Sequence, residues 1–166
     1  MDCYFNNNEY MNIVSDILDN NNFLSIEKCR HHGINRLEHS LHVSYYSYLI
    51  AKKLRLNYKD TARGSLLHDF FSKDDLKPNR QKFCFAIHPY LSLKNACNNF
   101  ELSDLEKDII INHMFPTLPH KIPKYAESWI VSLVDKSIAI YEFYCSYARS
   151  KVYKFANIYL AVLLFR

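Results

Sequence analysis

Apolar residues recur along this chain with the spacing of amphipathic helices, and no stretch alternates as a strand would. The pattern predicts a first helix over about residues 9–18 and a short second helix that Ser25 caps and Gly33 ends. Asn35 and Glu38 have the spacing of a capping box and should open a long third helix. The apolar stripe of that helix is expected to contain Val43, Tyr46, Ile50 and Leu54.

The second half of the chain continues the helical pattern. A fourth helix should span about residues 58–71, and a lysine-rich connection then leads to a helix that has Pro89 in its first turn and reaches residue 99. Ser103 and Glu106 form another capping-box pattern and should begin the helix that follows.

The C-terminal part of the pattern contains a long helix over about residues 125–147 and a final helix through "YKFANIYLAVLLF". No strand pattern or internal repeat competes with these helices, so we predict an all-α fold. At 166 residues and 49% hydrophobic content, the chain can form one domain over residues 1–166 with a core that needs no disulfides.

Composition narrows the classes of function. The net charge is +4 without a long basic block, so we expect no nucleic-acid polymer as a partner. The two glycines cannot supply the glycine-rich loop of a Rossmann or P-loop site. The five cysteines contain no Cys-x-x-Cys pair, which argues against a zinc finger. No leader pattern opens the chain and no apolar run reaches the roughly 20 residues of a membrane span, so we expect a cytoplasmic protein without membrane contact.

Histidine and aspartate interrupt several apolar segments, of which "SLLHDFF" is the first to stand out. A buried carboxylate costs several kcal/mol unless it is paired, hydrogen-bonded or bound to a metal, so Asp69 needs compensation. Imidazole and carboxylate groups together suit Mn, Fe or Zn. The candidate metal ligands are His39, His68, Asp69, His88, His113 and Asp135.

Each of these residues has a simpler explanation when it is taken alone. A single buried histidine is usually a hydrogen-bonded core residue, and Asp135, beside Lys136, could be a surface charge of a helix. Periodicity alone also separates His39 poorly from His42. Six such residues on successive helices are harder to explain in this way, so we favour a metal centre.

The order of these residues resembles the HD-domain metal-dependent phosphohydrolases, which are named for an adjacent His-Asp pair. The likeness covers about residues 36–135, includes the contexts "RLEHSLHV" and "LLHDF", and favours His39 over His42. It implies a helical bundle with a buried metal centre, on which the C-terminal helices pack. The minimal family pattern, which holds one metal, corresponds to His39, His68, Asp69 and Asp135.

The resemblance also implies a second metal position. His88 and His113 lie where family members with two metals have two further histidines, and Asp69 would bridge the ions. The length and spacing look closest to small bacterial diadenosine tetraphosphate hydrolases. The expected cofactors are one or two divalent metal ions per chain. Iron or manganese is favoured over zinc because oxygen and nitrogen ligands are mixed without a thiolate, and zinc, magnesium, cobalt and nickel are the alternatives.

The implied activity is hydrolysis of a phosphomonoester or phosphoanhydride, in a nucleotide or dinucleoside polyphosphate, by attack of metal-bound hydroxide on phosphorus. The candidate catalytic residues are Asp69, Arg36 and Lys73, and Arg63 is a further candidate cation. Each cation could equally be a solvated surface charge. Many family members have lysine three residues after the aspartate of the pair, whereas this chain has Ser72 there and its lysine at Lys73.

Two other functions are compatible with the same ligands. Some proteins of this helical scaffold hold two irons and oxidise a carbon substrate with O₂, and a third possibility is a non-catalytic nucleotide sensor. The expected partner is a small phosphorylated substrate, and the sequence leaves the oligomeric state, including a homodimer, open. The remaining histidines, His31, His32 and His120, have no support as ligands and are expected to be exposed, although His120 could border the pocket.

Overall fold

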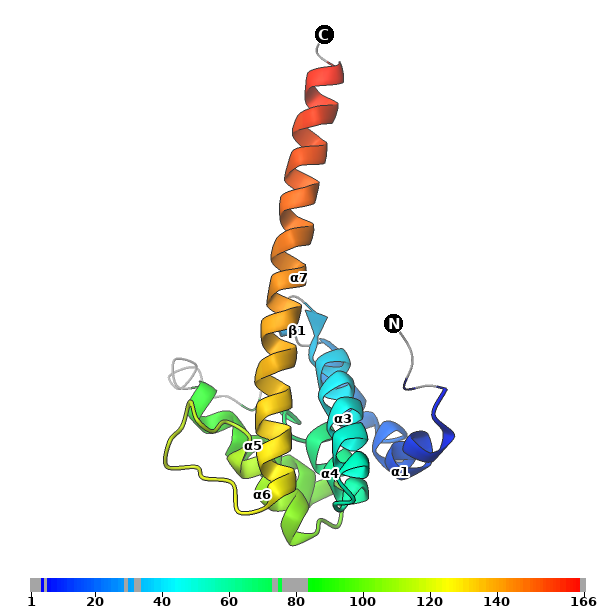
Figure 1. Cartoon of the computed structure of the whole chain (residues 1–166), viewed down its shortest axis with the longest axis vertical. Coiled ribbons are helices and arrows are strands. Elements are labelled where there is room, and N and C mark those ends of the chain that lie inside the picture. The colour runs from blue at the N-terminus through cyan, green and yellow to red at the C-terminus, as the bar shows by residue number, and fades with distance from the viewer. Residues whose placement is uncertain are drawn as a thin grey trace.

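The computed structural model describes residues 4, 6–28, 30, 31, 34–72, 75 and 84–164. Its elements in chain order are α1 (Asn8–Leu18), α2 (Asn21–Leu24), the 3₁₀ helix η1 (Ser25–Lys28), β1 (Arg30–His31), β2 (Ile34–Asn35), α3 (Arg36–Lys53), α4 (Tyr58–Leu66), α5 (Cys84–Asn99), α6 (Asp104–Asn112) and α7 (Ala126–Leu164). The predicted all-α fold is confirmed. Figure 1 shows α3 and the N-terminal part of α7 side by side among the shorter helices.

Two helix starts agree with the capping signals of the sequence. The Asn35 side chain accepts a hydrogen bond from the Glu38 backbone N–H at 2.7 Å and so caps α3. Ser103 and Glu106 form a complete capping box at the start of α6, in which each side chain accepts from the other residue's backbone N–H. These bonds satisfy N–H groups that a helix leaves unpaired at its first turn.

The region between α1 and α3 differs from the prediction. Asn20, and not Ser25, caps the second helix, because its side chain accepts from the N–H groups of Asn22 and Phe23. Gly33, the expected end of that helix, lies outside the described residues. The backbone here instead forms a two-residue antiparallel ladder between β1 and β2, which is too short to leave an alternating pattern in the sequence.

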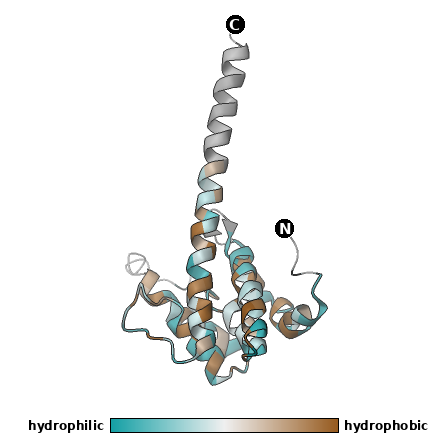
Figure 2. Ribbon diagram, viewed as in Figure 1, coloured by the Kyte–Doolittle hydropathy of each residue, from teal (hydrophilic) through white to brown (hydrophobic). Residues whose placement is uncertain are grey.

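The predicted apolar stripe of α3 is wrong beyond its first member. Val43 is fully buried, but Tyr46, Ile50 and Leu54 are 45%, 39% and 58% exposed. The buried face of this half of the helix includes small hydroxyl side chains that a hydropathy pattern counts as polar. Buried Ser44, for example, donates to the Ala62 carbonyl of α4 at 2.7 Å and accepts from the Tyr10 hydroxyl. Figure 2 shows hydrophobic and hydrophilic residues mixed along α3.

The fourth and fifth helices have other bounds than predicted. α4 ends at Leu66 and not near residue 71, and in the turn that follows the His68 ring donates to the Ser65 carbonyl at 2.6 Å. α5 is already helical at Cys84, so Pro89 lies inside the helix and not in its first turn. The predicted end of α5, at residue 99, is confirmed.

The C-terminal part of the chain forms one helix where two were predicted. α7 is continuous from Ala126 to Leu164, and its sequence contains neither glycine nor proline that could end it near residue 147. Figure 1 shows its C-terminal part extending away from the other helices. No helix in the described part of the chain is both long and apolar enough to cross a membrane.

Helices α3, α6 and α7 converge near the middle of the fold. α3 lies against α4 and α7, and α6 lies against α4, α5 and α7. A cluster of Val43, Ile109 and Val131 joins α3, α6 and α7. Gly64 lets α4 approach α6 closely, since a Cβ at this position would lie 3.1 Å from the Glu106 Cα atom. This packing brings the ends of α4 and α6 to the inner face of α7.

Candidate metal centre

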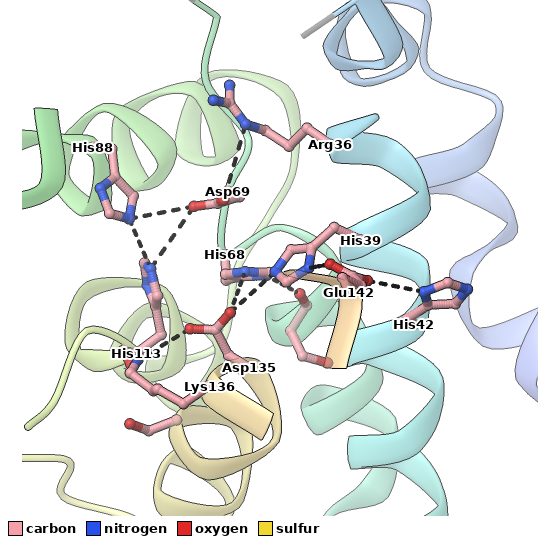
Figure 3. A network of polar contacts seen from close by, with 12 residues as sticks. Arg36, His39, His42, His68, Asp69, His88, His113, Asp135, Lys136 and Glu142 are labelled. Atoms are coloured by element: carbon pink, nitrogen blue, oxygen red, sulfur yellow. Dashed lines mark hydrogen bonds and ion pairs between the residues drawn. The ribbon is translucent and has the colours of Figure 1, made fainter. Parts of the chain in front are cut away.

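The structure brings all six candidate ligands into one buried cluster (Figure 3). They come from five different places in the fold, namely His39 on α3, His68 and Asp69 in the turn after α4, His88 on α5, His113 at the C-cap of α6 and Asp135 on α7. Exposure is at most 8% for any of them. Because they are separated in sequence by up to almost a hundred residues, only the helix packing described above places them together.

All four histidines of the cluster are oriented in the same way. Each ring uses its Nδ1–H group to donate to an acceptor outside the cluster, which leaves Nε2 directed inward. The acceptors are the Glu142 carboxylate for His39 at 2.8 Å and the backbone carbonyls of Ser65 for His68 at 2.6 Å, Cys84 for His88 at 3.0 Å and Ile110 for His113 at 2.8 Å. This is the arrangement that metal-ligating histidines adopt in proteins.

The inward nitrogens gather around two carboxylates. Asp69 Oδ1 lies 3.3 Å from His88 Nε2 and 3.8 Å from His113 Nε2. On the other side, Asp135 Oδ1 lies 3.1 Å from His39 Nε2 and 3.7 Å from His68 Nε2. Two of the three compact groups of potential ligands contain Asp69 and share that residue, namely His39, His68 and Asp69, and Asp69, His88 and His113. A bridging position for Asp69 is therefore compatible with the geometry.

The contact between His88 and His113 is a test of whether a cation fits. Their Nε2 atoms are 2.9 Å apart, and both Nδ1–H groups already donate elsewhere. Burial lowers the pKa of His88, and burial with the neighbouring imidazoles lowers the pKa of His113 well below its usual range. Two neutral rings in this orientation direct lone pairs at each other, and a cation held by both would replace that repulsion with coordination. The donor set therefore fits a divalent metal.

The opposite half of the cluster is charged. Burial alone would lower the pKa of His39, but Asp135 and Glu142 outweigh it and raise the pKa of His39 to about 10. Burial acts to raise the pKa of Asp135, yet the imidazoles of His39 and His68 hold it well below the usual range. A metal held by His39 and Asp135 would take the place of the proton between them.

A cavity of about 440 Å³ opens beside the cluster and is lined by Asp69, His88, His113 and Asp135. Arg36 also lines it, with Nε 3.9 Å from Asp69 Oδ2 and the guanidinium 3.8 Å from the centre of the Phe71 ring. Arg36 also donates to the Phe71 carbonyl, so this side chain joins the start of α3 to the segment after the His-Asp pair.

The sequence did not identify Lys136 as part of the site. Its ammonium group donates to the His113 carbonyl and lies 3.0 Å from Asp135 Oδ2, and its side chain lines the cavity. The surface-charge explanation of this Asp-Lys pair is therefore wrong for Asp135, which is 8% exposed. A lysine directly after a candidate ligand was the available signal.

Glu142 was missed as well. It is 4% exposed, its Oε2 accepts from His39 Nδ1, and its Oε1 accepts from His42 Nδ1 at 3.1 Å. His42 thus faces this carboxylate and not the centre of the cluster, which agrees with the preference for His39. The missed signal was the interval of seven residues between Asp135 and Glu142, because two helical turns place both on one face of α7.

The other candidates do not join the cluster in the described part of the chain. Lys73 and His32 lie outside the described residues, as does the side chain of His31. Arg63 contacts Asp16 and Glu106 and is not among the residues that line the cavity, so a phosphate contact by Arg63 is not supported. His120 is exposed, as expected, and does not line the cavity either.

Comparison with protein families gives the identity of the domain. Residues 36–140 match the model of the HD domain, a range that includes all six candidate ligands. The chain belongs to the HD-domain family. HD domains are typically metal-dependent phosphohydrolases, and the buried histidine and aspartate groups of this HD domain suit divalent metal binding. No curated protein and no solved structure matches the chain.

Proposed function

We propose that this HD-domain protein is a metal-dependent phosphohydrolase that acts on a nucleotide or a dinucleoside polyphosphate. The observation that carries the proposal is the convergence of four imidazole Nε2 atoms and two buried carboxylates beside a cavity that also contains two cationic side chains. Anionic phosphate groups suit such a cavity, because both its cations and its metals attract them.

The residues of the cluster would hold one or two ions. His39, His68 and Asp135 would bind one, His88 and His113 the other, and Asp69 would serve both. Bound divalent ions neutralise charge on a phosphoryl group and lower the pKa of water, which supplies a nucleophile near neutral pH. Iron or manganese is the proposed identity, because imidazole and carboxylate ligands are mixed without a thiolate.

The cations of the cavity would act directly on the substrate. Arg36 and Lys136 both line it, on α3 and α7 respectively, so they can approach a phosphoryl group from two sides. Their positive charge would stabilise the negative charge that phosphate oxygens carry in the transition state. Arg36 would also hold Asp69 through their ion pair.

The rest of the cavity suits the organic part of the substrate. Phe71 stacks on the His88 ring with the two planes 28° apart, and Phe85 and Met114 add further apolar surface. The volume of about 440 Å³ lies in the range of about 300–1,000 Å³ that is usual for small-molecule sites. Aromatic walls beside two cations support a nucleotide, whose base can stack while its phosphates meet the charges.

The experiment is metal analysis of the purified protein followed by a screen for phosphate release. The protein is loaded with Mn²⁺ or Fe²⁺, and mononucleotides, dinucleoside polyphosphates and p-nitrophenyl phosphate are offered with and without a chelator. Asp135→Asn should lose the activity, and Lys107→Gln, at an exposed position on α6, should keep it. Turnover that persists in a metal-free protein would overturn the proposal.

The same screen separates the two alternatives. Consumption of O₂ by the Fe²⁺-loaded protein, without phosphate release, would identify an oxygenase. Full metal loading with neither reaction, but with nucleotide binding, would identify a sensor.

A further inference from the structure

Glu142 is a buried carboxylate that accepts from a candidate metal ligand, His39, at the ring nitrogen that faces away from the cluster (Figure 3). It lies on α7 beyond residues 36–140, the range that matches the HD domain. Its two oxygens accept from two histidines of α3, His39 Nδ1 at 2.8 Å and His42 Nδ1 at 3.1 Å. Both donors and the carboxylate itself are less than 10% exposed.

We propose that Glu142 is a positioning residue that orients His39 for metal binding and strengthens the metal position to which His39 contributes. The inference rests on the proposed metal centre and adds a residue to it. Its physical basis is that an acceptor on Nδ1–H fixes the ring, keeps the proton off Nε2 of the neutral tautomer and makes Nε2 a better donor to a metal.

The acceptor of His39 differs from those of the other three rings. His68, His88 and His113 each donate to a backbone carbonyl of their own segment, three or four residues earlier in the chain. His39 instead reaches across from α3 to a full negative charge on α7. A carboxylate polarises an imidazole more strongly than a neutral carbonyl does, because hydrogen bonds to ionised acceptors are about twice as strong. We therefore expect His39 to be the strongest imidazole donor of the cluster.

Two features of the surroundings hold Glu142 in place. His42 occupies the second oxygen, so the carboxylate cannot rotate without losing a hydrogen bond in a buried site. Tyr4 packs edge-on against the His42 ring, with the ring centres 6.2 Å apart, and covers it. Asp135, on the same face of α7, meets the opposite nitrogen of His39. Two carboxylates on one face of α7 therefore contact both ring nitrogens of His39.

A purely structural role for Glu142, as a buried link between α3 and α7, makes a different prediction. Loss of such a link would lower the stability of the whole bundle and weaken both metal positions together. A positioning role would weaken only the metal position to which His39 contributes. His88 and His113 donate to carbonyls of α5 and α6 and do not depend on Glu142.

The test uses the full chain and Mn²⁺ alone as the probe. Metal-free wild type, Glu142→Gln and Glu142→Asp are titrated with Mn²⁺ in competition with a chelating indicator, and both affinities are extracted. We expect Glu142→Gln, which keeps the size of the side chain but loses its charge, to weaken one Mn²⁺ position about 10- to 100-fold and to leave the other within about threefold. Glu142→Asp, which keeps the charge but is shorter, should fall between wild type and Glu142→Gln. If Glu142→Gln does not fold, the Mn²⁺ affinities of Glu142→Asp decide between the positioning role and the structural role.

Glu127→Gln is the matched control. Glu127 is another buried glutamate of α7, and it links α7 to the start of α4 by accepting from the Asn57 backbone N–H at 3.0 Å. The same substitution there should lower stability without changing either Mn²⁺ affinity. His42→Gln should weaken Mn²⁺ binding less than Glu142→Gln does, because it keeps the bond between Glu142 and His39.

The outcomes separate this inference from the proposed function. Unchanged Mn²⁺ affinities in folded Glu142→Gln, or an equal loss at both positions, would overturn the positioning role. If Glu142→Gln weakened one Mn²⁺ position as expected but the wild type hydrolysed no phosphoester, the proposed function alone would be overturned. A wild type that binds no Mn²⁺ would overturn both.

Discussion

Asp135 and Glu142, two turns apart on α7, contact the two opposite nitrogens of one imidazole, that of His39 on α3. The contact between α3 and α7 therefore contains part of the candidate metal centre. Whatever binds at His39 and Asp135 also holds these two helices together, so metal binding and folding stability should be coupled.

Metal removal should lower thermal stability. An ion that binds only the folded protein, present at about one hundred times its dissociation constant, stabilises it by about 2.7 kcal/mol. For a chain of this size, that corresponds to a rise in melting temperature of roughly 5–10 °C. The measurement is thermal unfolding with Mn²⁺ and with excess chelator. Identical melting curves, together with no metal in elemental analysis, would contradict a metal centre.

Asp69→Ala should abolish phosphohydrolase activity and lower the metal content while the helices stay formed. Asp69 lies in both of the ligand groups proposed for the two metal positions, so its loss affects both ions, and removal of a buried charge compensates for the missing metal. Elemental analysis measures the metal content, turnover measures the activity, and far-ultraviolet circular dichroism measures the helix content. Asp104→Ala, at a side chain that is 88% exposed, is the control. Normal metal content and full turnover in Asp69→Ala would invalidate the ligand assignment.

His88→Ala and His113→Ala should each weaken one metal far more than the other. Their Nε2 atoms are 2.9 Å apart and form a group with Asp69, separate from His39. Loss of one ion should slow hydrolysis of a phosphoanhydride by a factor of about 10² or more, because one of two charges that stabilise the transition state is removed. Metal stoichiometry and rate are measured on each variant.

His42→Ala is the control for these two variants. It should keep both metals at saturating concentration, because His42 contacts Glu142 and no carboxylate of the cluster. If His42→Ala lost a metal and His88→Ala did not, the proposed ligand set would have to be replaced.

Lys136→Met should lower kcat/KM for a phosphorylated substrate by about 10²-fold, because it removes a cation of the cavity that we propose to stabilise the phosphoryl group. The packing of the side chain at position 136 should be largely preserved, because methionine retains most of the apolar stem of lysine. Steady-state kinetics measure the effect, with Lys107→Met on α6 as the control, at an exposed lysine paired only with exposed Asp104 among the described residues. Equal kcat/KM in Lys136→Met and wild type would remove Lys136 from the site.

Gly64→Ala should destabilise the fold by about 1–2 kcal/mol. The added Cβ would lie 3.1 Å from Glu106 Cα and 3.1 Å from Ile109 Cδ1, so α4 and α6 must separate slightly. This net value combines an overpacking cost of about 1–3 kcal/mol with the gain of up to about 1 kcal/mol that alanine brings to a helix interior. Urea unfolding measures the difference, with Ser137→Ala on the exposed face of α7 as the control. Wild-type stability in Gly64→Ala would show that the two helices tolerate the wider spacing.

Local chemistry allowed much of this protein to be predicted from its sequence. The caps at Asn35 and Ser103 act within one turn of a helix, and the sequence positions of the candidate ligands could be read because charged or polar residues interrupt apolar segments. The resemblance to HD domains also depends only on residue order. None of these inferences requires knowledge of which helices touch.

The features that were missed depend on contacts between distant segments. Tyr46 and Ile50 are exposed because the buried face of α3 includes serines, such as Ser44, that pack against α4 although a hydropathy pattern counts them as polar. Glu142 belongs to the site only because α7 crosses α3 at His39, more than one hundred residues away in sequence. Hydropathy and spacing describe one helix at a time, whereas the partners of a buried charge are chosen by the packing of several helices.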